Sequence, residues 1–105
     1  MKIYGYTVIC SDGLLSGRES QTYISAKKGD LLNRAYIQYR QMRKSAMVSK
    51  QLDIKLDTAI SKDDFATEIF EEGVIIYCRS HHITFEGFTC ELEDVEKVKE
   101  KKRTA

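Results

Sequence analysis

The order of apolar and polar residues at the start of the chain predicts a β-strand over residues 2–10. Successive side chains of a strand point to opposite faces, so each face can be read from the sequence. One face would carry Tyr4, Tyr6, Val8 and Cys10, and the other would carry Ile3, Gly5, Thr7 and Ile9. Because both faces are partly apolar, the pattern favours a strand in the interior of a sheet.

The residues that follow predict a β-hairpin. Asp12-Gly13 tolerates positive φ at both positions, which is the chemistry of a tight hairpin turn, and Leu14-Leu15 begins the return. The polar stretch 16–20 is expected to form a loop or a bulged edge. A short β-rich run at 22–24 then forms a strand that ends at Ser25.

The apolar periodicity changes to the helical type over residues 27–48. Side chains spaced three and four residues apart form one apolar stripe, which consists of Leu32, Ala35, Tyr39, Met42 and Ala46. Such a stripe is typical of an amphipathic helix that packs one face on a core. This long helix is therefore expected to cover one face of the sheet.

A further strand and a second helix are expected next. Leu52, Ile54 and Leu56 alternate with polar residues, as in a half-exposed strand. Ser61 then precedes Asp64 by three residues, in a pattern that resembles a helix-capping box. The pattern predicts a helix over residues 62–72 that buries Phe65, Ile69 and either Ala66 or Phe70.

Gly73 can take the left-handed conformation that ends a helix, and the apolar run 74–78 after it predicts a buried strand. This strand is expected to pair with a β-rich segment at 82–90, in which Glu86-Gly87 marks a turn or a bulge. Residues 93–103 predict a final short helix, acidic at its start and basic at its end.

Together the elements have the order ββαβαββα and predict an α+β fold. We expect a mainly antiparallel sheet of four or five strands, with one long helix packed on a face and two shorter helices. The length of 105 residues suits a single compact domain over residues 1–105. Its tail is expected to fray from about residue 99.

The composition is that of a globular protein, with 42% hydrophobic and 31% charged residues. No stretch approaches the roughly 18 apolar residues of a membrane span, and no signal-peptide core is recognisable. The odd number of cysteines, three, favours thiols in a reducing compartment. A cytoplasmic location without membrane association is therefore expected.

Charge is distributed unevenly along the chain. Residues 1–50 hold nine Lys/Arg against three Asp/Glu, a net charge of +6, whereas residues 51–105 hold eight against thirteen, a net charge of −5. The net charge of the whole chain is only +1, because the charges of the two halves nearly cancel. This asymmetry favours a partner of opposite charge on one face, or two faces of one domain that complement each other.

The positive charge is concentrated on the long helix. Its candidate binding face consists of Arg34, Arg40, Arg43 and Lys44. Phosphate would be attracted to such a face, and the interleaved Tyr36 and Tyr39 could stack on bases, so nucleic-acid binding is one interpretation. However, Tyr39 also belongs to the apolar stripe, and the pI of about 7.7 is low for a nucleic-acid-binding domain. A solvated helix face is the other interpretation.

The negative charge is concentrated in residues 53–96, which hold twelve acidic side chains against three basic ones, a net charge of −9. The candidate acidic surface consists of Asp63, Asp64, Glu68, Glu71 and Glu72. A surface of this kind can bind a basic groove on a partner protein, including one that normally holds nucleic acid. Alternatively, it faces the basic helix across solvent and is neutralised internally.

One short cluster contains residue types that bind zinc, and its candidate ligands are Cys78, His81, His82 and Cys90. Their spacing matches neither paired Cys-x-x-Cys elements nor the usual zinc-finger pattern. A hairpin with core cysteines and exposed histidines is therefore the preferred interpretation, and a Cys78–Cys90 disulfide ranks below free thiols. Phosphate-binding Gly-rich loops, Gly-x-Ser-x-Gly elbows and His-Glu-x-x-His pairs are absent from the sequence.

These observations favour a small non-catalytic interaction or regulatory protein, with inhibition as one mode of regulation, that acts through opposed acidic and basic surfaces. Its expected partner is another protein or a second copy of itself, and no cofactor is expected. Nucleic-acid binding through the basic helix, residues 27–50, is the first alternative. A small enzyme or a zinc-binding protein is the second.

Overall fold

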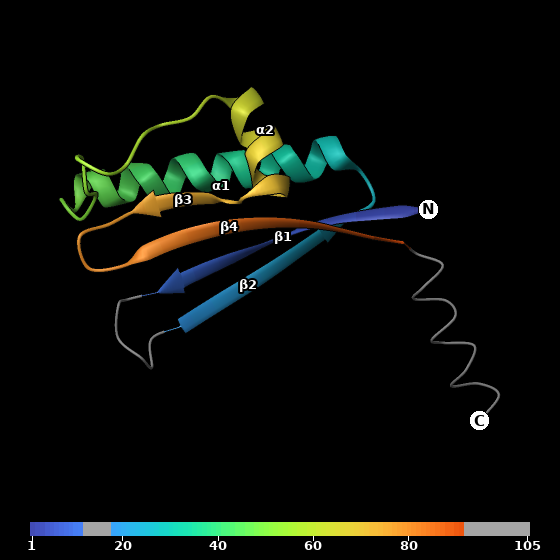
Figure 1. The fold of residues 1–105 in the computed structure, drawn as a ribbon, viewed down its shortest axis with the longest axis horizontal. Helices are drawn as coiled ribbons and strands as arrows, with labels where there is room; N and C mark the ends of the chain where they lie inside the picture. The colour runs from blue at the N-terminus through green and yellow to red at the C-terminus, as the bar shows by residue number, and fades with distance from the viewer. Residues whose placement is uncertain (12–17, 92–105) are drawn as a thin grey trace.

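The computed structural model describes residues 1–11 and 18–91 (Figure 1). Several predicted features lie outside the described residues. They are the turn at Asp12-Gly13, the start of the return at Leu14-Leu15, and the final helix over 93–103 with its frayed tail.

The described elements form two layers (Figure 1). One antiparallel sheet has the strand order β2-β1-β4-β3 and consists of β1 (Lys2–Ser11), β2 (Arg18–Ser25), β3 (Val74–Tyr77) and β4 (His82–Glu91). Two helices, α1 (Lys28–Val48) and α2 (Lys62–Glu71), lie on one face of it. α1 packs over β1 and β2, whereas α2 packs over β4 and β3. Of the predicted α+β fold with four or five strands, one long helix and two shorter ones, the described residues confirm the α+β class and an antiparallel sheet of four strands with a long and a short helix.

The predicted element order is wrong, because the strand expected from Leu52, Ile54 and Leu56 does not form; the described order is ββααββ. Leu52 is buried and makes a single bridge to Cys78, but the chain turns at once afterwards. The Asp53 carboxylate accepts hydrogen bonds from the backbone N–H groups two and three positions further on, at 3.1 and 3.3 Å. Such a local turn competes with strand formation, and it leaves Ile54 and Leu56 exposed.

Two strands are longer than the sequence indicates. β2 begins at Arg18, so the stretch 18–20 belongs to the strand rather than to a loop. β4 runs in continuous register through Glu86-Gly87, which form neither a turn nor a bulge. A Cβ on Gly87 would lie 2.7 Å from Cδ1 of Phe70 and 2.9 Å from the backbone oxygen of Ile69. This glycine therefore allows α2 to approach the sheet closely.

An aromatic core lies between the helices and the sheet. Its fully buried rings are Tyr6 of β1, Tyr39 of α1, Phe65 of α2 and Phe85 of β4. The ring centroid of Tyr39 lies 5.2 Å from that of Phe65 and 6.0 Å from that of Phe85. Each of these elements contributes one ring to the same cluster, so the cluster holds the two layers together.

The helices bury the faces that the periodicity indicates, with one shift. α1 buries Leu31, Ala35, Tyr39 and Ala46, whereas the predicted Leu32 and Met42 are only partly buried. At the start of α2 the Ser61 hydroxyl accepts a hydrogen bond from the backbone N–H of Asp64, as the capping pattern predicts. After its end, Gly73 has a φ of 84°, which confirms its predicted role. Neither of the described helices is long and apolar enough to cross a membrane.

Candidate interaction surfaces

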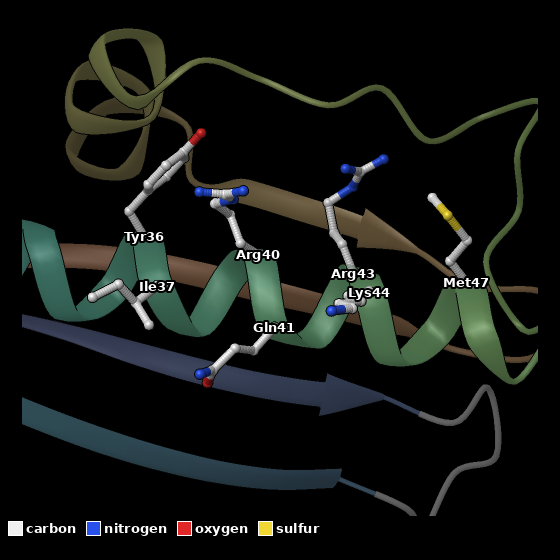
Figure 2. A pocket seen from close by; sticks show the side chains of 7 residues that line it. All are labelled: Tyr36, Ile37, Arg40, Gln41, Arg43, Lys44 and Met47. Carbon is white, nitrogen blue, oxygen red and sulfur yellow. The ribbon is translucent and has the colours of Figure 1, made fainter.

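The outward side of α1 carries a hollow of about 440 Å³. Figure 2 shows that its lining side chains come from several turns of this one helix. They are Tyr36, Ile37, Arg40, Gln41, Arg43, Lys44 and Met47. Three of the four basic residues predicted from the sequence therefore meet at one hollow, which we call the basic hollow.

Apolar side chains are exposed among these basic groups. Ile37 is 56% exposed, Met47 is 55% exposed, and Val48 at the end of the helix is 76% exposed. A single exposed apolar residue is ordinary, but three on the same helix beside a hollow mark an unusual surface. These exposed apolar residues are not among the binding residues predicted from the sequence. The available signal was that Ile37 and Met47 lie off the predicted apolar stripe and yet are apolar.

The fourth predicted basic residue, Arg34, lies in an adjoining hollow between α1 and β2. Its guanidinium carbon is 4.0 Å from the centroid of the Tyr23 ring. This second hollow shares Ile37 and Gln41 with the basic hollow, so the two form one continuous surface along α1. The stacking holds Arg34 against the protein while leaving the residue exposed.

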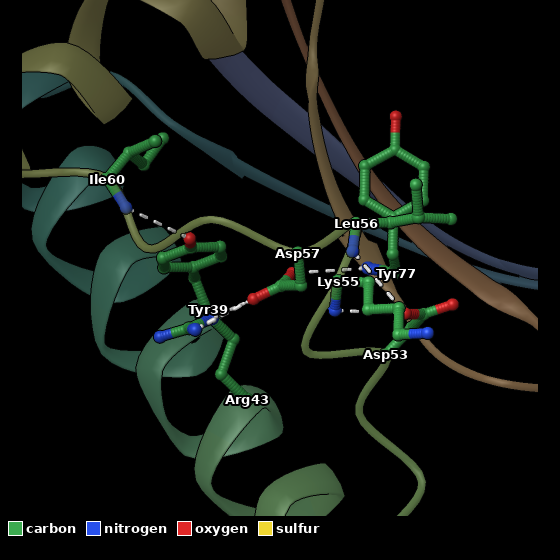
Figure 3. Close-up of polar contacts among 8 residues, drawn as sticks. All are labelled: Tyr39, Arg43, Asp53, Lys55, Leu56, Asp57, Ile60 and Tyr77. Carbon is green, nitrogen blue, oxygen red and sulfur yellow. Dashed lines mark hydrogen bonds and ion pairs between the residues drawn. The ribbon is translucent and has the colours of Figure 1, made fainter.

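Arg43 has a partner inside the protein (Figure 3). Its Nε and Nη2 atoms lie 2.8 and 2.7 Å from Oδ2 of Asp57, whose side chain is 0% exposed. The other oxygen of Asp57 accepts a hydrogen bond from the backbone N–H of Tyr77 at 3.2 Å. Asp57 therefore links α1 to the edge strand β3. Arg43 is largely committed to this structural pair, whereas no ion pair is recorded for Arg40 and Lys44 in the described residues.

The segment 49–61, which connects the helices and runs beside α1, is fixed by two tyrosines. The Tyr36 hydroxyl donates to the backbone oxygen of Ile60, and the Tyr39 hydroxyl accepts from the backbone N–H of the same residue, at 3.3 and 3.4 Å. Burial raises the pKa of Tyr39, although the hydrogen bond from Ile60 opposes this shift. Both tyrosines predicted to stack on nucleic-acid bases therefore already have partners within the protein.

The predicted acidic residues gather on the other helix. Asp63, Asp64, Glu68, Glu71 and Glu72 are all exposed, on α2 or at its C-cap. Glu68 and Glu72 line a hollow of about 310 Å³ together with parts of the segment 49–61 and of β3. This acidic hollow and the basic hollow have no lining residue in common. The two charged surfaces are thus separate parts of the helical layer.

Direct ion pairs do not neutralise these exposed charges in the described residues. There the structure records one ion pair, between Arg43 and Asp57, and none that joins the exposed carboxylates of α2 to the basic groups of α1. The acidic and basic surfaces both remain accessible. Each is available to a partner of opposite charge.

Three of the four candidate zinc ligands, Cys78, His81 and His82, line one hollow of about 180 Å³, whereas Cys90 lies elsewhere. Cys78 is buried and is bridged to Leu52 of the segment 49–61. The backbone N–H of Cys78 donates a hydrogen bond to the backbone oxygen of His81 across a tight turn. His82 packs edge-on against Tyr77, with 5.0 Å between ring centroids. Cys90 is exposed near the far end of β4, about 26 Å from His82 at about 3.3 Å per residue. Among the described residues, no cluster of His, Cys, Asp and Glu is suited to a metal ion.

The two cysteines of this set carry free thiols, so the Cys78–Cys90 disulfide does not form. The expectation of a core position is correct for Cys78 and wrong for Cys90, which is exposed. Burial raises the pKa of the Cys78 thiol, and the nearby Asp57 carboxylate raises it further. Cys78 is therefore held in its unreactive, protonated form.

Comparison with known proteins gives no match to a protein family, to a curated protein or to a solved structure. A proposal about function therefore depends on the surfaces alone.

Proposed function

We propose that the protein is a small non-catalytic interaction protein, and that its basic hollow binds an acidic, amphipathic segment of a partner protein. The observation that carries this proposal is the mixture of chemistry on α1. Ile37 and Met47 are each more than half exposed at the same hollow as Arg40 and Lys44. A segment that presents both carboxylates and apolar side chains would satisfy both kinds of group at once.

The shape of the surface supports a helical partner. α1 has 21 residues, which is about 32 Å at about 1.5 Å per residue, and its exposed side offers a long shallow surface rather than a closed pocket. Amphipathic helices bind such surfaces through anchors spaced three and four residues apart. Pairing of α1 with its own copy is disfavoured, because the basic groups of the two helices would then face each other.

Nucleic-acid binding is the second candidate, and the exposed positions of Arg34, Arg40 and Lys44 favour it. Two features count against it. Phosphates do not use the exposed apolar groups Ile37 and Met47, and the tyrosines that would stack on bases are engaged by Ile60. The protein partner is therefore the better match to the whole surface.

A direct comparison of two probes tests the proposal. One is a fluorescent amphipathic helical peptide whose contact face carries leucines flanked by glutamates, and the second is a labelled 20-base-pair DNA duplex. We expect peptide binding, measured by fluorescence anisotropy, to persist at about 0.2 M salt because part of it is apolar. Binding through phosphates alone, with about three phosphate contacts, should weaken about 40-fold between about 0.05 and 0.2 M salt.

Charge-reversal variants of the two helices then locate the site. Arg40→Glu combined with Lys44→Glu should weaken peptide binding about 100-fold, whereas Asp63→Lys combined with Asp64→Lys should leave it unchanged or improve it. Ile37→Ser alone should weaken it about fivefold through lost apolar contact. The proposal is wrong if the peptide does not bind, or if binding survives the α1 reversal. Tighter binding of DNA than of peptide would favour the second candidate.

A further inference from the structure

The face of the sheet opposite the helices is not covered by any described element (Figure 1). The strand register shows which residues share it. In one row across three strands, Gly5 lies between Ile24 and Phe88. In another, Thr84 lies between Ile9 and Ile75. Apolar residues therefore extend over all four strands of this face.

The aromatic ring of Phe88 lies over Gly5 of the neighbouring strand β1. A Cβ on Gly5 would be only 2.3 Å from Cζ of Phe88, so the glycine is required for this ring position. Phe88 remains 36% exposed, and Ile24, on the other side of Gly5, remains 66% exposed. The row Ile24, Gly5 and Phe88 is therefore an exposed apolar row across three strands.

The chemistry of this face differs from that of a sheet face adapted to water. An antiparallel sheet with one solvated face alternates apolar residues inside with polar residues outside. Here the strand register places on this face Ile3, Gly5, Thr7, Ile9, Ser11, Arg18, Ser20, Thr22, Ile24, Ile75, Tyr77, His82, Thr84, Glu86, Phe88 and Cys90. Arg18 and Glu86 are its two charged residues other than histidine, and their charges have opposite signs. Apolar and small uncharged residues make up most of the rest of this face.

We propose that this face, which we call the open face, packs against the open face of a second copy of the chain to form a homodimer. The proposal is independent of the proposed function, because it concerns the side of the sheet that faces away from α1 and α2. Sheets pack face to face when their exposed side chains are apolar or small, about 10 Å apart. The resulting dimer would have its two basic hollows on its two outer sides.

Charge and area favour a second copy over other occupants. The open face carries one basic and one acidic residue, Arg18 and Glu86, so two identical open faces meet with little net repulsion, whereas a strongly charged partner would gain little here. The strands have 10, 8, 4 and 10 residues. At about 3.3 Å per residue and about 4.8 Å between strands, one face has a footprint of about 500 Å². Two such faces, with their side-chain relief, approach the roughly 1,200 Å² at which specific interfaces begin.

Light scattering coupled to size-exclusion chromatography tests the dimer with the full chain. At about 100 μM the mass should be about twice the 12.1 kDa of one chain, and it should fall toward one chain on dilution. Ile9→Lys and, separately, Ile24→Lys should each raise the dimer dissociation constant about tenfold or more by placing charge in the interface. Ile24 is already mostly exposed, so its variant remains informative even if Ile9→Lys does not fold.

A control variant identifies the surface. Ile37→Lys, a matched change on α1, should leave the dimer intact. The proposal is overturned if the wild-type chain is monomeric over the whole concentration range, or if the two open-face variants dimerise as the wild type does. It is equally overturned if Ile37→Lys dissociates the dimer as strongly as Ile24→Lys.

Discussion

The two helices cover the same sheet face, yet their outward surfaces differ in one decisive respect. α1 exposes Ile37, Met47 and Val48 among its basic groups, whereas α2 itself exposes no large apolar side chain, and Leu56 of the connecting segment is the one exposed large apolar residue that lines the acidic hollow. Both surfaces are charged, and both adjoin a hollow. Charge alone therefore does not distinguish a binding surface from a solvated one. Exposed apolar groups placed among the charges provide that distinction.

The largest expected effect separates the structural arginine of α1 from the surface arginine beside it. Arg43→Ala should lower the free energy of unfolding by about 3 kcal/mol, because it leaves the carboxylate of Asp57 buried without its partner. Arg40→Ala, one helical turn away, should change it by less than about 0.5 kcal/mol. Urea denaturation monitored by circular dichroism measures both. Equal losses would show that Arg40 is also part of the scaffold.

The attachment of α2 to the sheet depends on the close approach of α2 to Gly87 of β4 rather than on a buried ion pair. Gly87→Ala should lower the free energy of unfolding by about 2 kcal/mol, because its Cβ would overlap Phe70 and the backbone of α2. Gly29→Ala in the first turn of α1 is the matched control. No atom lies within 4 Å of its Cβ position, so helix propensity should make the change neutral or stabilising. A tolerated Gly87→Ala would mean that α2 can move away from the sheet at little cost.

The smallest expected effect is a pH dependence confined to the α1 side of the core. Burial raises the pKa values of Tyr6 and Tyr39 above 10.0, and the Tyr6 hydroxyl donates to Gln38 of α1. Folding favours the neutral form of both tyrosine hydroxyls. The stability that this preference contributes is therefore complete below pH 10, and it is lost as the pH rises from 10 through the raised pKa values of the folded state. Tyr39→Phe should reduce this loss.

Denaturation at several pH values between about 9 and 11 measures that slope. An identical slope in Tyr39→Phe and wild-type protein would show that Tyr39 does not contribute to it.

The sequence was sufficient where local patterns decide the structure. The stripe of α1, the Ser61 cap of α2 and the interior position of β1 depend on spacing and on short-range hydrogen bonds. It failed after α1, where the carboxylate of Asp53 turns the backbone although Leu52, Ile54 and Leu56 alternate like a strand. Side-chain competition of this kind reverses a weak periodic signal.

The candidate site was predicted only in part, for a different reason. Four basic residues were identified correctly as a group on one helix, but the role of Arg43 depends on Asp57, fourteen positions away in a segment with no regular structure. The function of Gly87 likewise depends on its contact with α2. Such contacts are set by tertiary structure, which single-sequence periodicity does not encode.

The most direct test of the central claim is a nuclear magnetic resonance titration of ¹⁵N-labelled full-length protein with the acidic amphipathic peptide. The account predicts that the largest backbone shift changes fall on α1 around Ile37, Gln41 and Lys44. Residues of α2 and of the open face should change little. Shift changes concentrated on α2, or no saturable change at all, would contradict the claim that the basic hollow is the binding surface.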